Sequence, residues 1–406
     1  MTKNHYRLTT ISCFVGIFVQ AIVTNLTAIL FIPMMELYSL SYVHLGILVA
    51  VNFSTQVAAD IIFSGLIDRI GFRRLVLPCT LVAFTGLILF GMTPYIFPHA
   101  VFTGIVIATV IFSFASGLLE VLLSPIIDAI PNENKGPAMA LMHSFYAWGQ
   151  VATIIITTLF IRIAGKSMWN LIALFWAAVP LAAFVMFSAS PFPPNKHTEG
   201  GHAAVRKQIF SPVYIAAIFA IMFGGASEVV MNQWASSFTE RALNLPKVTG
   251  DLLGMCGFAV MLGIGRSLYG VFGAKINLRR VMMTSAAVAI LCYLTVAFSP
   301  WPAVSLIACA VCGLATSLLW PGTLVLASER FPAAGAWLFA VLAAAGDIGA
   351  SSGSALTGVV VDAARSSSAE EAAIRTGLGF AVIFPIGALI ALFAMRAKKD
   401  CKCQSL

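Results

Sequence analysis

The chain has 406 residues, of which 60% are apolar and only 10% are charged, and its mean hydropathy is +0.95. A soluble domain has roughly 45–50% apolar and about 25% charged residues, so this composition excludes a soluble globular protein. The net charge of +8 could suit nucleic acid, but the basic residues are distributed as in a membrane protein, so we expect no nucleic-acid partner.

Twelve apolar segments of span length follow one another, separated by turn residues and charges. The first is too long for a signal-peptide core and has no small-residue cleavage site, so we expect it to remain as a span. We predict transmembrane helices at 9–35, 42–66, 75–97, 100–129, 137–161, 168–190, 209–239, 251–273, 280–299, 302–328, 333–361 and 376–395.

The longest polar connection, 191–208, divides these segments into two blocks of six. We therefore predict an all-α polytopic membrane protein made of two six-helix bundles. The expected parts are an N-terminal bundle at 1–190, a cytoplasmic linker at 191–208, a C-terminal bundle at 209–396 and a cytoplasmic tail at 397–406.

The basic residues predict the orientation of these spans. With the N-terminus inside, 17 of the 24 Lys and Arg residues lie in cytoplasmic segments, 6 lie on the opposite side, and Arg266 lies within a helix. By the positive-inside rule, this asymmetry places both termini in the cytoplasm. We expect a multi-pass protein of the plasma membrane.

The two blocks resemble each other after their second spans. Gly65 to Arg74 reads GLIDRIGFRR, and Gly270 to Arg280 reads GVFGAKINLRR, so both stretches run from a glycine to a double arginine. The first stretch resembles the G-x-x-x-D-R-x-G-R-R loop of the major facilitator superfamily. Together with the six-plus-six layout and the central linker, it identifies the chain as a member of that superfamily.

The resemblance implies that the first loop latches the two halves together on the cytoplasmic side. Asp68 can cap a helix dipole or pair with an arginine, or it can simply balance the basic cluster around it. Asp60 and Arg266 occupy similar positions before the two loops and carry opposite charges, so they can belong to the same charge relay. The predicted latch residues are Gly65, Asp68, Arg69, Gly71, Arg73, Asp60 and Arg266.

Ionisable side chains inside a bilayer are costly and are therefore candidates for function. Glu120 and His143 flank the turn between the fourth and fifth segments at similar distances, so we expect them at similar depth. A buried carboxylate and a histidine both suit proton uptake and release, which predicts proton coupling through Glu120 and His143. The alternative is that either residue serves packing only.

A second group of polar residues suits a polyol substrate. The seventh segment carries Glu228, Asn232, Gln233 and Trp234, and the pair Gly224–Gly225 can loosen this helix. Amides and carboxylates bind hydroxyls, and an indole offers a flat apolar face; alternatively, the tryptophan is interfacial and the glutamate pairs within the bundle. Including residues on other segments, the predicted substrate-binding set is Gln20, Asn25, Tyr146, Gln150, Glu228, Asn232, Gln233, Trp234, Trp320 and Asp347.

Two further features concern the helices of the second block. Pro321 can bend the tenth segment because proline lacks a backbone N–H. Asp347 in the eleventh segment can pair with Arg266 or bind substrate, and the sequence does not choose between these roles.

Glu120, and the stretch from Gly225 to Trp234, resemble the fucose/glucose–proton symporter branch of the superfamily. The resemblance implies uptake of a neutral sugar or sugar derivative with a proton. In the fucose symporter a second acid lies in the first span, where this chain has only Gln20 and Asn25. His143 or Glu228 would replace that acid, or the coupling differs.

We therefore predict a secondary transporter, not an enzyme, that moves a sugar by proton symport with alternating access. The alternative is a proton-coupled exporter of drugs or metabolites, which the absence of a basic residue from 100–129 counts against. No cofactor and no metal are expected. The expected partners are a small-molecule substrate, protons and the lipid bilayer, and the protein is expected to act as a monomer.

Overall fold

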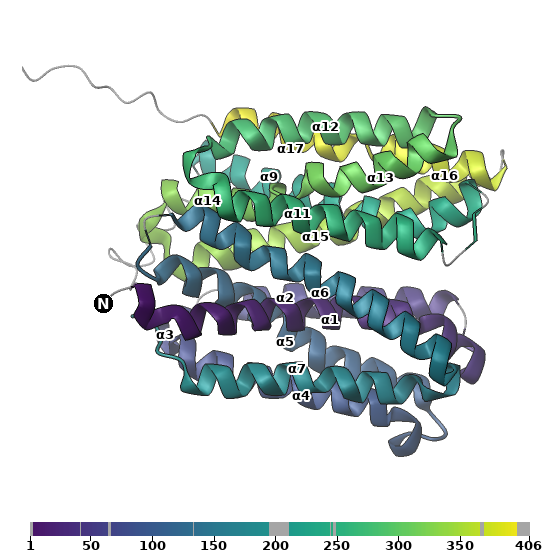
Figure 1. The fold of residues 1–406 in the computed structure, drawn as a ribbon, viewed down its shortest axis with the longest axis horizontal. Helices are drawn as coiled ribbons and strands as arrows, with labels where there is room; N and C mark the ends of the chain where they lie inside the picture. The colour runs from purple at the N-terminus through teal and green to yellow at the C-terminus, as the bar shows by residue number, and fades with distance from the viewer. Residues whose placement is uncertain are drawn as a thin grey trace, which may run out of the picture.

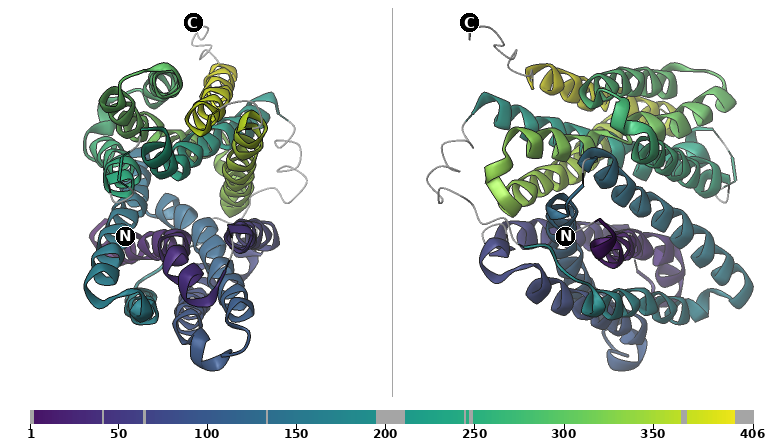
Figure 2. Two further views of the ribbon diagram at one scale, coloured as in Figure 1. Left: turned by 90° about the vertical axis from the view of Figure 1, so that its right-hand side faces the viewer. Right: turned by 60° about the vertical axis from the view of Figure 1, so that its left-hand side comes forward.

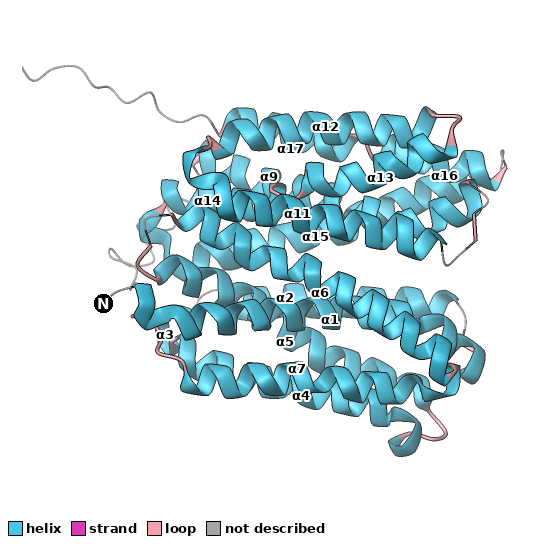
Figure 3. Ribbon diagram, in the orientation of Figure 1, coloured by secondary structure: helices cyan, strands magenta, loops and turns pink. Residues whose placement is uncertain are grey.

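A computed structural model describes residues 3–40, 42–63, 66–132, 134–194, 211–243, 245–246, 249–365 and 369–395. Every regular element in these ranges is helical (Figure 3). The first group of helices comprises α1 (Arg7–Tyr38), α2 (Tyr42–Phe63), α3 (Ile67–Ile70), α4 (Phe72–Ile96), α5 (Val101–Ala129), α6 (Lys135–Ala164) and α7 (Trp169–Ala189). The second group comprises α9 (Pro212–Ser237), α11 (Cys256–Phe272), α12 (Leu278–Phe298), α13 (Pro302–Thr316), α14 (Leu319–Arg330), α15 (Gly335–Arg365), α16 (Glu370–Phe380) and α17 (Ile383–Ala394).

The two groups form two bundles that lie side by side, with α1–α7 in one half and α9–α17 in the other (Figure 1). Seen end-on, the helices of each half surround their own centre (Figure 2). We call the end of the molecule where α1 begins, α7 ends and α9 begins the linker end, and the opposite end the far end. Successive crossings then alternate in direction between these two ends, with α13 and α14 together forming one crossing and α16 and α17 another.

The chain contains enough apolar helix for twelve membrane crossings. Eleven helical stretches in the described residues are long and apolar enough to span a bilayer, and Ile47–Phe63 of α2 is a shorter apolar stretch. Large apolar side chains such as Phe298 (77% exposed) and Ile163 (84% exposed) face outward, as expected of a surface that contacts lipid. The predicted all-helical, multi-pass fold is therefore confirmed.

The last crossing begins earlier than the sequence predicted. We expected it at 376, but α16 begins at Glu370. Glu370 and Glu371 occupy the first turn of α16, where negative charge is stabilised by the helix dipole. A search for apolar residues alone misses such a polar first turn.

Pro321 explains why the tenth crossing consists of two helices, α13 and α14. Proline has no N–H to donate to the carbonyl four residues earlier, which is that of Ser317. The helix is interrupted at Ser317 and Leu318, as the bend predicted at Pro321 requires. The freed carbonyl of Ser317 becomes an acceptor for a side chain from α11.

The two loops of the internal repeat have a shared structural role. Arg73 donates to the carbonyls of Ser188 (2.6 Å) and Ser190 (3.3 Å) at the end of α7. Arg279 donates to the carbonyls of Leu392 (2.9 Å) and Phe393 (3.1 Å) in the last turn of α17. Each arginine thus caps the last helix of its own half, where a cation is favoured by the dipole.

The halves approach each other closely at the linker end, along α6 and α11. A Cβ placed on Gly270 would lie 2.8 Å from the Cβ of Leu141, so only glycine permits this crossing. The indole of Trp148 donates to the hydroxyl of Ser267 at 3.1 Å. α2 of the first half also packs against α15 of the second.

Candidate functional site

A central cavity lies between the two halves at the depth of Glu120. Its volume is about 110 Å³, which gives room for several water molecules. The described residues that line it are Gln20, Thr24, Asn25, Ala28, Phe53, Gln56, Glu120, His143, Tyr146, Glu228, Val229, Asn232, Gln233, Met255, Arg266, Trp320, Asp347 and Ala350. Both halves therefore contribute polar side chains to one cavity.

Glu120 is buried on α5 and accepts a short hydrogen bond from the side-chain amide of Gln20 on α1. α5 continues for nine more residues before it ends, so Glu120 lies about 14 Å from the linker end of that helix. No ion pair joins Glu120 to a basic side chain among the described residues. A single neutral donor leaves this carboxyl free to gain or lose a proton without breaking a salt bridge.

Arg266 on α11 holds three parts of the molecule together. The residue is 2% exposed, and its Nη2 donates to both oxygens of the Glu228 carboxylate on α9, at 2.7 and 2.8 Å. Its Nε donates to the carbonyl that Pro321 leaves free, that of Ser317, at 2.9 Å. Its Nη1 donates to the carbonyl of His143 in the other half at 3.2 Å. These four hydrogen bonds offset the cost of burying this charge.

This arrangement decides one alternative that the sequence left open. Among the described residues Arg266 pairs with Glu228, and not with Asp347. Arg266 also lies on the cavity wall. A charge relay that includes both Asp60 and Arg266 stays a prediction.

His143 lies on α6, within the same cavity as Glu120. Its Nε2 is 3.3 Å from the hydroxyl of Ser124 on α5, and its ring is buried. His143 and Glu120 therefore share the cavity, as their similar depth suggested, but each has its own hydrogen-bonding partner. Their role in proton coupling stays a prediction.

Asp347 and Asp60 are acidic residues of the region around the cavity. Asp347 on α15 lines the cavity and is 6% exposed, whereas Asp60 on α2 is fully buried and does not line it. Within the described part of the chain, both side-chain oxygens of Asp60 lack a hydrogen-bond partner. The Oδ2 atom of Asp347 also lacks one.

Most of the predicted substrate-binding residues lie on the cavity wall. These are Gln20, Asn25, Tyr146, Glu228, Asn232, Gln233, Trp320 and Asp347. Gln150 is buried and does not line the cavity, but its side-chain amide donates to the lining residue Asn232 of the other half at 3.1 Å. Trp234 is not among the lining residues, and its indole instead approaches Gly358 on α15.

The expectation that Gly224–Gly225 loosens the seventh span is wrong. α9 runs unbroken from Pro212 to Ser237 through both glycines. A Cβ on Gly224 would lie 2.9 Å from the Cβ of Leu319, and one on Gly225 would lie 2.8 Å from the indole of Trp320. The two glycines therefore let α14 approach α9, and this seats Trp320 at the cavity.

The predicted latch residues have several different surroundings. Gly65 lies outside the described residues, and so does the side chain of Asp68, although its backbone belongs to α3. Gly71 has φ +94° and ψ 151°, a conformation open essentially to glycine alone, and it joins α3 to α4. Arg69 is exposed on α3, while Arg73 caps α7 within its own half. A latching role for these residues stays a prediction.

The sequence reasoning missed the contribution of α2 to the cavity. Phe53 and Gln56 line it, and Gln56 donates to Asn52 at 2.5 Å and accepts from Ser116 at 3.0 Å. The signal was present: Asn52, Gln56 and Asp60 are spaced by four residues and so form one polar stripe on an otherwise apolar helix.

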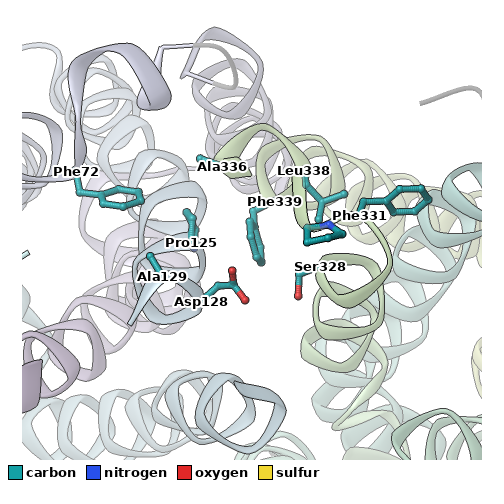
Figure 4. Close-up of a pocket in the computed structure, with 10 residues that line it drawn as sticks. Phe72, Pro125, Asp128, Ala129, Ser328, Phe331, Ala336, Leu338 and Phe339 are labelled. Carbon is teal, nitrogen blue, oxygen red and sulfur yellow. The ribbon is translucent and has the colours of Figure 1, made fainter. Parts of the chain in front are cut away.

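A second, smaller pocket of about 20 Å³ lies between the halves nearer the linker end. Figure 4 shows Asp128 of α5 facing Ser328 and Phe339, which belong to α14 and α15. Asp128 follows Glu120 by eight residues, so this pocket lies about 12 Å closer to the linker end. Apolar side chains from both halves, including Phe72 and Phe331, line this pocket.

The chemistry of the central cavity favours solutes without negative charge. Arg266 is neutralised by Glu228, so Glu120 and Asp347 remain as carboxyls without a basic partner among the described residues. The other lining groups are amides, the imidazole of His143, the hydroxyl of Thr24, a phenol, an indole and apolar side chains. Among the residues described, no group of three or more His, Cys, Asp or Glu side chains is placed to hold a metal ion.

Two helical bundles that enclose a polar cavity at membrane depth define a secondary transporter. The family model "Major Facilitator Superfamily" matches residues 13–353, and the chain belongs to this superfamily. It is therefore a transporter that binds a small molecule within the membrane, and not an enzyme. No curated protein matches the sequence.

Solved structures of this superfamily have the same fold. The E. coli fucose:proton symporter FucP is 17% identical with a TM-score of 0.75, and the match covers 95% of this chain and 99% of that one. The proton:xylose symporter XylE, bound to 6-bromo-6-deoxy-D-glucose, is 13% identical with a TM-score of 0.82, and the match covers 97% and 96%. At these identities the likeness shows the fold alone.

Proposed function

We propose that this protein takes up a sugar or sugar derivative together with a proton, by alternating access of the central cavity to the two sides of the membrane. The observation that carries the proposal is Glu120, a buried carboxyl on the cavity wall whose described partner is the amide of Gln20. Such a group can bind a proton at the solute site itself, so that binding of the proton and binding of the sugar are coupled.

The remaining lining groups support a neutral polyol. Gln20, Asn25 and Asn232 offer both donors and acceptors, as pairs of hydroxyl groups require. Trp320 and Tyr146 supply flat apolar faces for the C–H groups of a ring. FucP is a fucose:proton symporter and XylE is a proton:xylose symporter, and both have the same fold as this chain. Their fold is therefore compatible with the proposed activity.

The two halves provide the moving parts. We propose an N-terminal bundle at 1–190 and a C-terminal bundle at 209–396, joined by a linker at 191–208. Close contacts at α6–α11 would separate during the cycle, and Arg266 would lose its bond to the carbonyl of His143. Its bonds to Glu228 and Ser317 lie within one half and would persist.

The test is uptake into proteoliposomes across a panel of labelled sugars, with and without an imposed pH gradient. We expect the gradient to drive accumulation of at least one sugar. Glu120→Gln should abolish this accumulation but retain exchange of the sugar across the membrane at equal concentrations. Glu371→Gln is the matched control, because the Glu371 side chain is 51% exposed and does not line the cavity. Unaltered accumulation by Glu120→Gln would contradict the proposed coupling.

An exporter of cationic amphiphiles is the second candidate. It is favoured by the excess of carboxyls in the cavity beside Phe53, Tyr146 and Trp320, since aromatic faces attract cations. If no sugar accumulates and an amphiphilic cation elicits proton release from loaded vesicles, export replaces uptake as the function.

A further inference from the structure

Asp60 is a buried acid for which the proposed cycle has no use so far. Its side chain is fully buried in the last turn of α2, and both of its oxygens lack a hydrogen-bond partner in the described residues. α2 is held tightly against α5 beside it, because Gly117 allows the backbone of Gln56 to approach closely. An ionised carboxylate in such a place would be neither solvated nor paired, so the group must bind a proton or another cation.

Asp347 is the candidate to share this role. It lies on α15, which packs against α2 across the boundary between the halves. Its Oδ2 atom also lacks a partner within the described structure, and it lines the cavity together with Gln56, which precedes Asp60 by one turn of α2. The cavity reaches Asp347 but not Asp60.

We propose that Asp60 and Asp347 form a second proton-binding site, separate from Glu120, that must be protonated for α2 and α15 to pack together. This proposal rests on the proposed proton-coupled transport. Asp347 takes its proton from water in the cavity. Asp60 lies in the last turn of α2, which packs against α15 of the other half. Separation of α2 from α15 would expose Asp60 to water, and its carboxyl would then give up its proton to that water.

The charged groups on the packed helices leave the two acids without compensation. α5 carries Glu120 at the cavity and Asp128 at the second pocket, which residues of α15 also line. His143 of α6 also lines the cavity, and Arg266 of α11 is already paired with Glu228 of α9. α1 carries no acidic, basic or histidine side chain between Arg7 and Glu36. The ionisable groups of the other elements that pack against α2 or α15 lie toward the two ends of the bundle: Arg69 of α3, Glu329 and Arg330 of α14, and Glu370, Glu371 and Arg375 of α16.

A proton suits this site better than a metal ion. A bound cation would need several further oxygen ligands, and no cluster of three or more potential metal-binding side chains occurs in the residues described. One proton on each carboxyl removes the repulsion between the halves without any other ligand.

The test measures the protons directly, in the purified full-length protein without substrate. Infrared difference spectroscopy during a pH titration reports the C=O band of protonated carboxyls. The variants are Asp60→Asn, Asp347→Asn and the double variant, and the control is Asp362→Asn, since Asp362 is exposed on the same helix as Asp347. Asp60→Glu, which keeps a carboxyl, tests whether a loss of signal follows from the missing acid or from misfolding.

We expect the wild type to show the C=O band of protonated carboxyls at neutral pH. Glu120→Gln should remove only the contribution of Glu120 to this band. The double variant should remove the contribution that remains in Glu120→Gln. Asp362→Asn and Asp60→Glu should keep the band. A band that is unchanged in the double variant would overturn the site, and a band that responds to replacing K⁺ by Na⁺ at constant pH would overturn the assignment to a proton.

Transport assays separate this proposal from the proposed function. If the wild type shows no pH-driven uptake while the infrared result holds, proton symport fails and the proton site remains. If the wild type accumulates sugar but the double variant does so with the same pH profile as Asp362→Asn, the second site has no part in coupling and the proposal is wrong.

Discussion

Arg266 shows how a charge can be kept inside the membrane part of this protein. Its guanidinium has a carboxylate, two backbone carbonyls and almost no exposure to water. One of those carbonyls exists as an acceptor only because Pro321 cannot donate to it. A proline on α14 and an arginine on α11 are thus parts of one arrangement, although they are 55 positions apart in the sequence.

Removing one partner of the ion pair should cost more than removing both. Arg266→Met leaves the Glu228 carboxylate buried without a counter-charge, which typically lowers the free energy of unfolding by about 3–5 kcal/mol. Glu228→Gln leaves Arg266 with an amide in place of the charge and should be destabilising to a similar or smaller extent. The double variant should recover part of the loss.

Thermal and denaturant unfolding of the four proteins in detergent would provide this comparison. Lys166→Met is the control, because both side chains of the Lys166–Glu36 pair are about half exposed and the loss should be small. Strictly additive effects of the two central substitutions would show that the pair contributes no coupling energy.

At the residue scale, the sequence identified the polar side chains within the apolar helices, but it did not predict which of them point into the cavity. Eleven of the residues singled out for coupling, substrate binding or the latch reach the cavity, since ionisable and amide side chains in apolar helices have few other places to go. Gln150 and Trp234 do not reach it, and Gln56 was missed. The rotation of each helix about its axis decides this, and a helix that is apolar on nearly every side does not reveal that rotation.

At the scale of helices, small residues decide how closely the halves can meet. α6 and α11 cross at Gly270, where a Cβ would be 2.8 Å from the Cβ of Leu141 and 3.1 Å from its Cα. Further along the same pair, Gly263 lies against the indole of Trp148. Close packing at a glycine gives contact energy without a flexible side chain to order, which suits an interface that forms and breaks repeatedly.

Gly270→Ala should therefore shift the balance between conformations. Its methyl group would collide with the backbone of α6, so the state with the linker end closed becomes less stable and the state with that end open becomes more populated. Gly257→Ala on the same helix is the control, since its nearest neighbour would lie at 3.9 Å.

Spin labels on α6 and α11 near the linker end would measure this shift as a larger share of long interlabel distances. We expect a change of at least several-fold in the population ratio, since even about 1 kcal/mol changes such a ratio by about fivefold. Equal distance distributions for the two glycine variants would show that the crossing at Gly270 does not control the opening.

Helix positions were predictable to within a few residues because apolar length is a strong signal. The last crossing was misplaced at its start because Glu370 and Glu371 are polar residues of a helical turn. The unbroken course of α9 could not be foreseen from Gly224–Gly225. Glycine pairs permit both a break and a close contact, and only the presence of Leu319 and Trp320 beside them decides for contact.

At the scale of the whole molecule, the orientation in the membrane determines what the described conformation means. The closest contacts between the halves lie at the linker end, along α6–α11 and around the pocket at Asp128. The excess of basic residues, 17 against 6, predicts that this end faces the cytoplasm. The described state would then be closed toward the cytoplasm.

An epitope tag inserted between Pro98 and His99, in the loop at the far end, should bind antibody on intact cells. The same tag after Leu406 should bind only after permeabilisation. Transport of the tagged proteins controls for misfolding, and each tag serves as the control for the other. Access to the C-terminal tag in intact cells would reverse the orientation, and the described state would then be closed toward the outside.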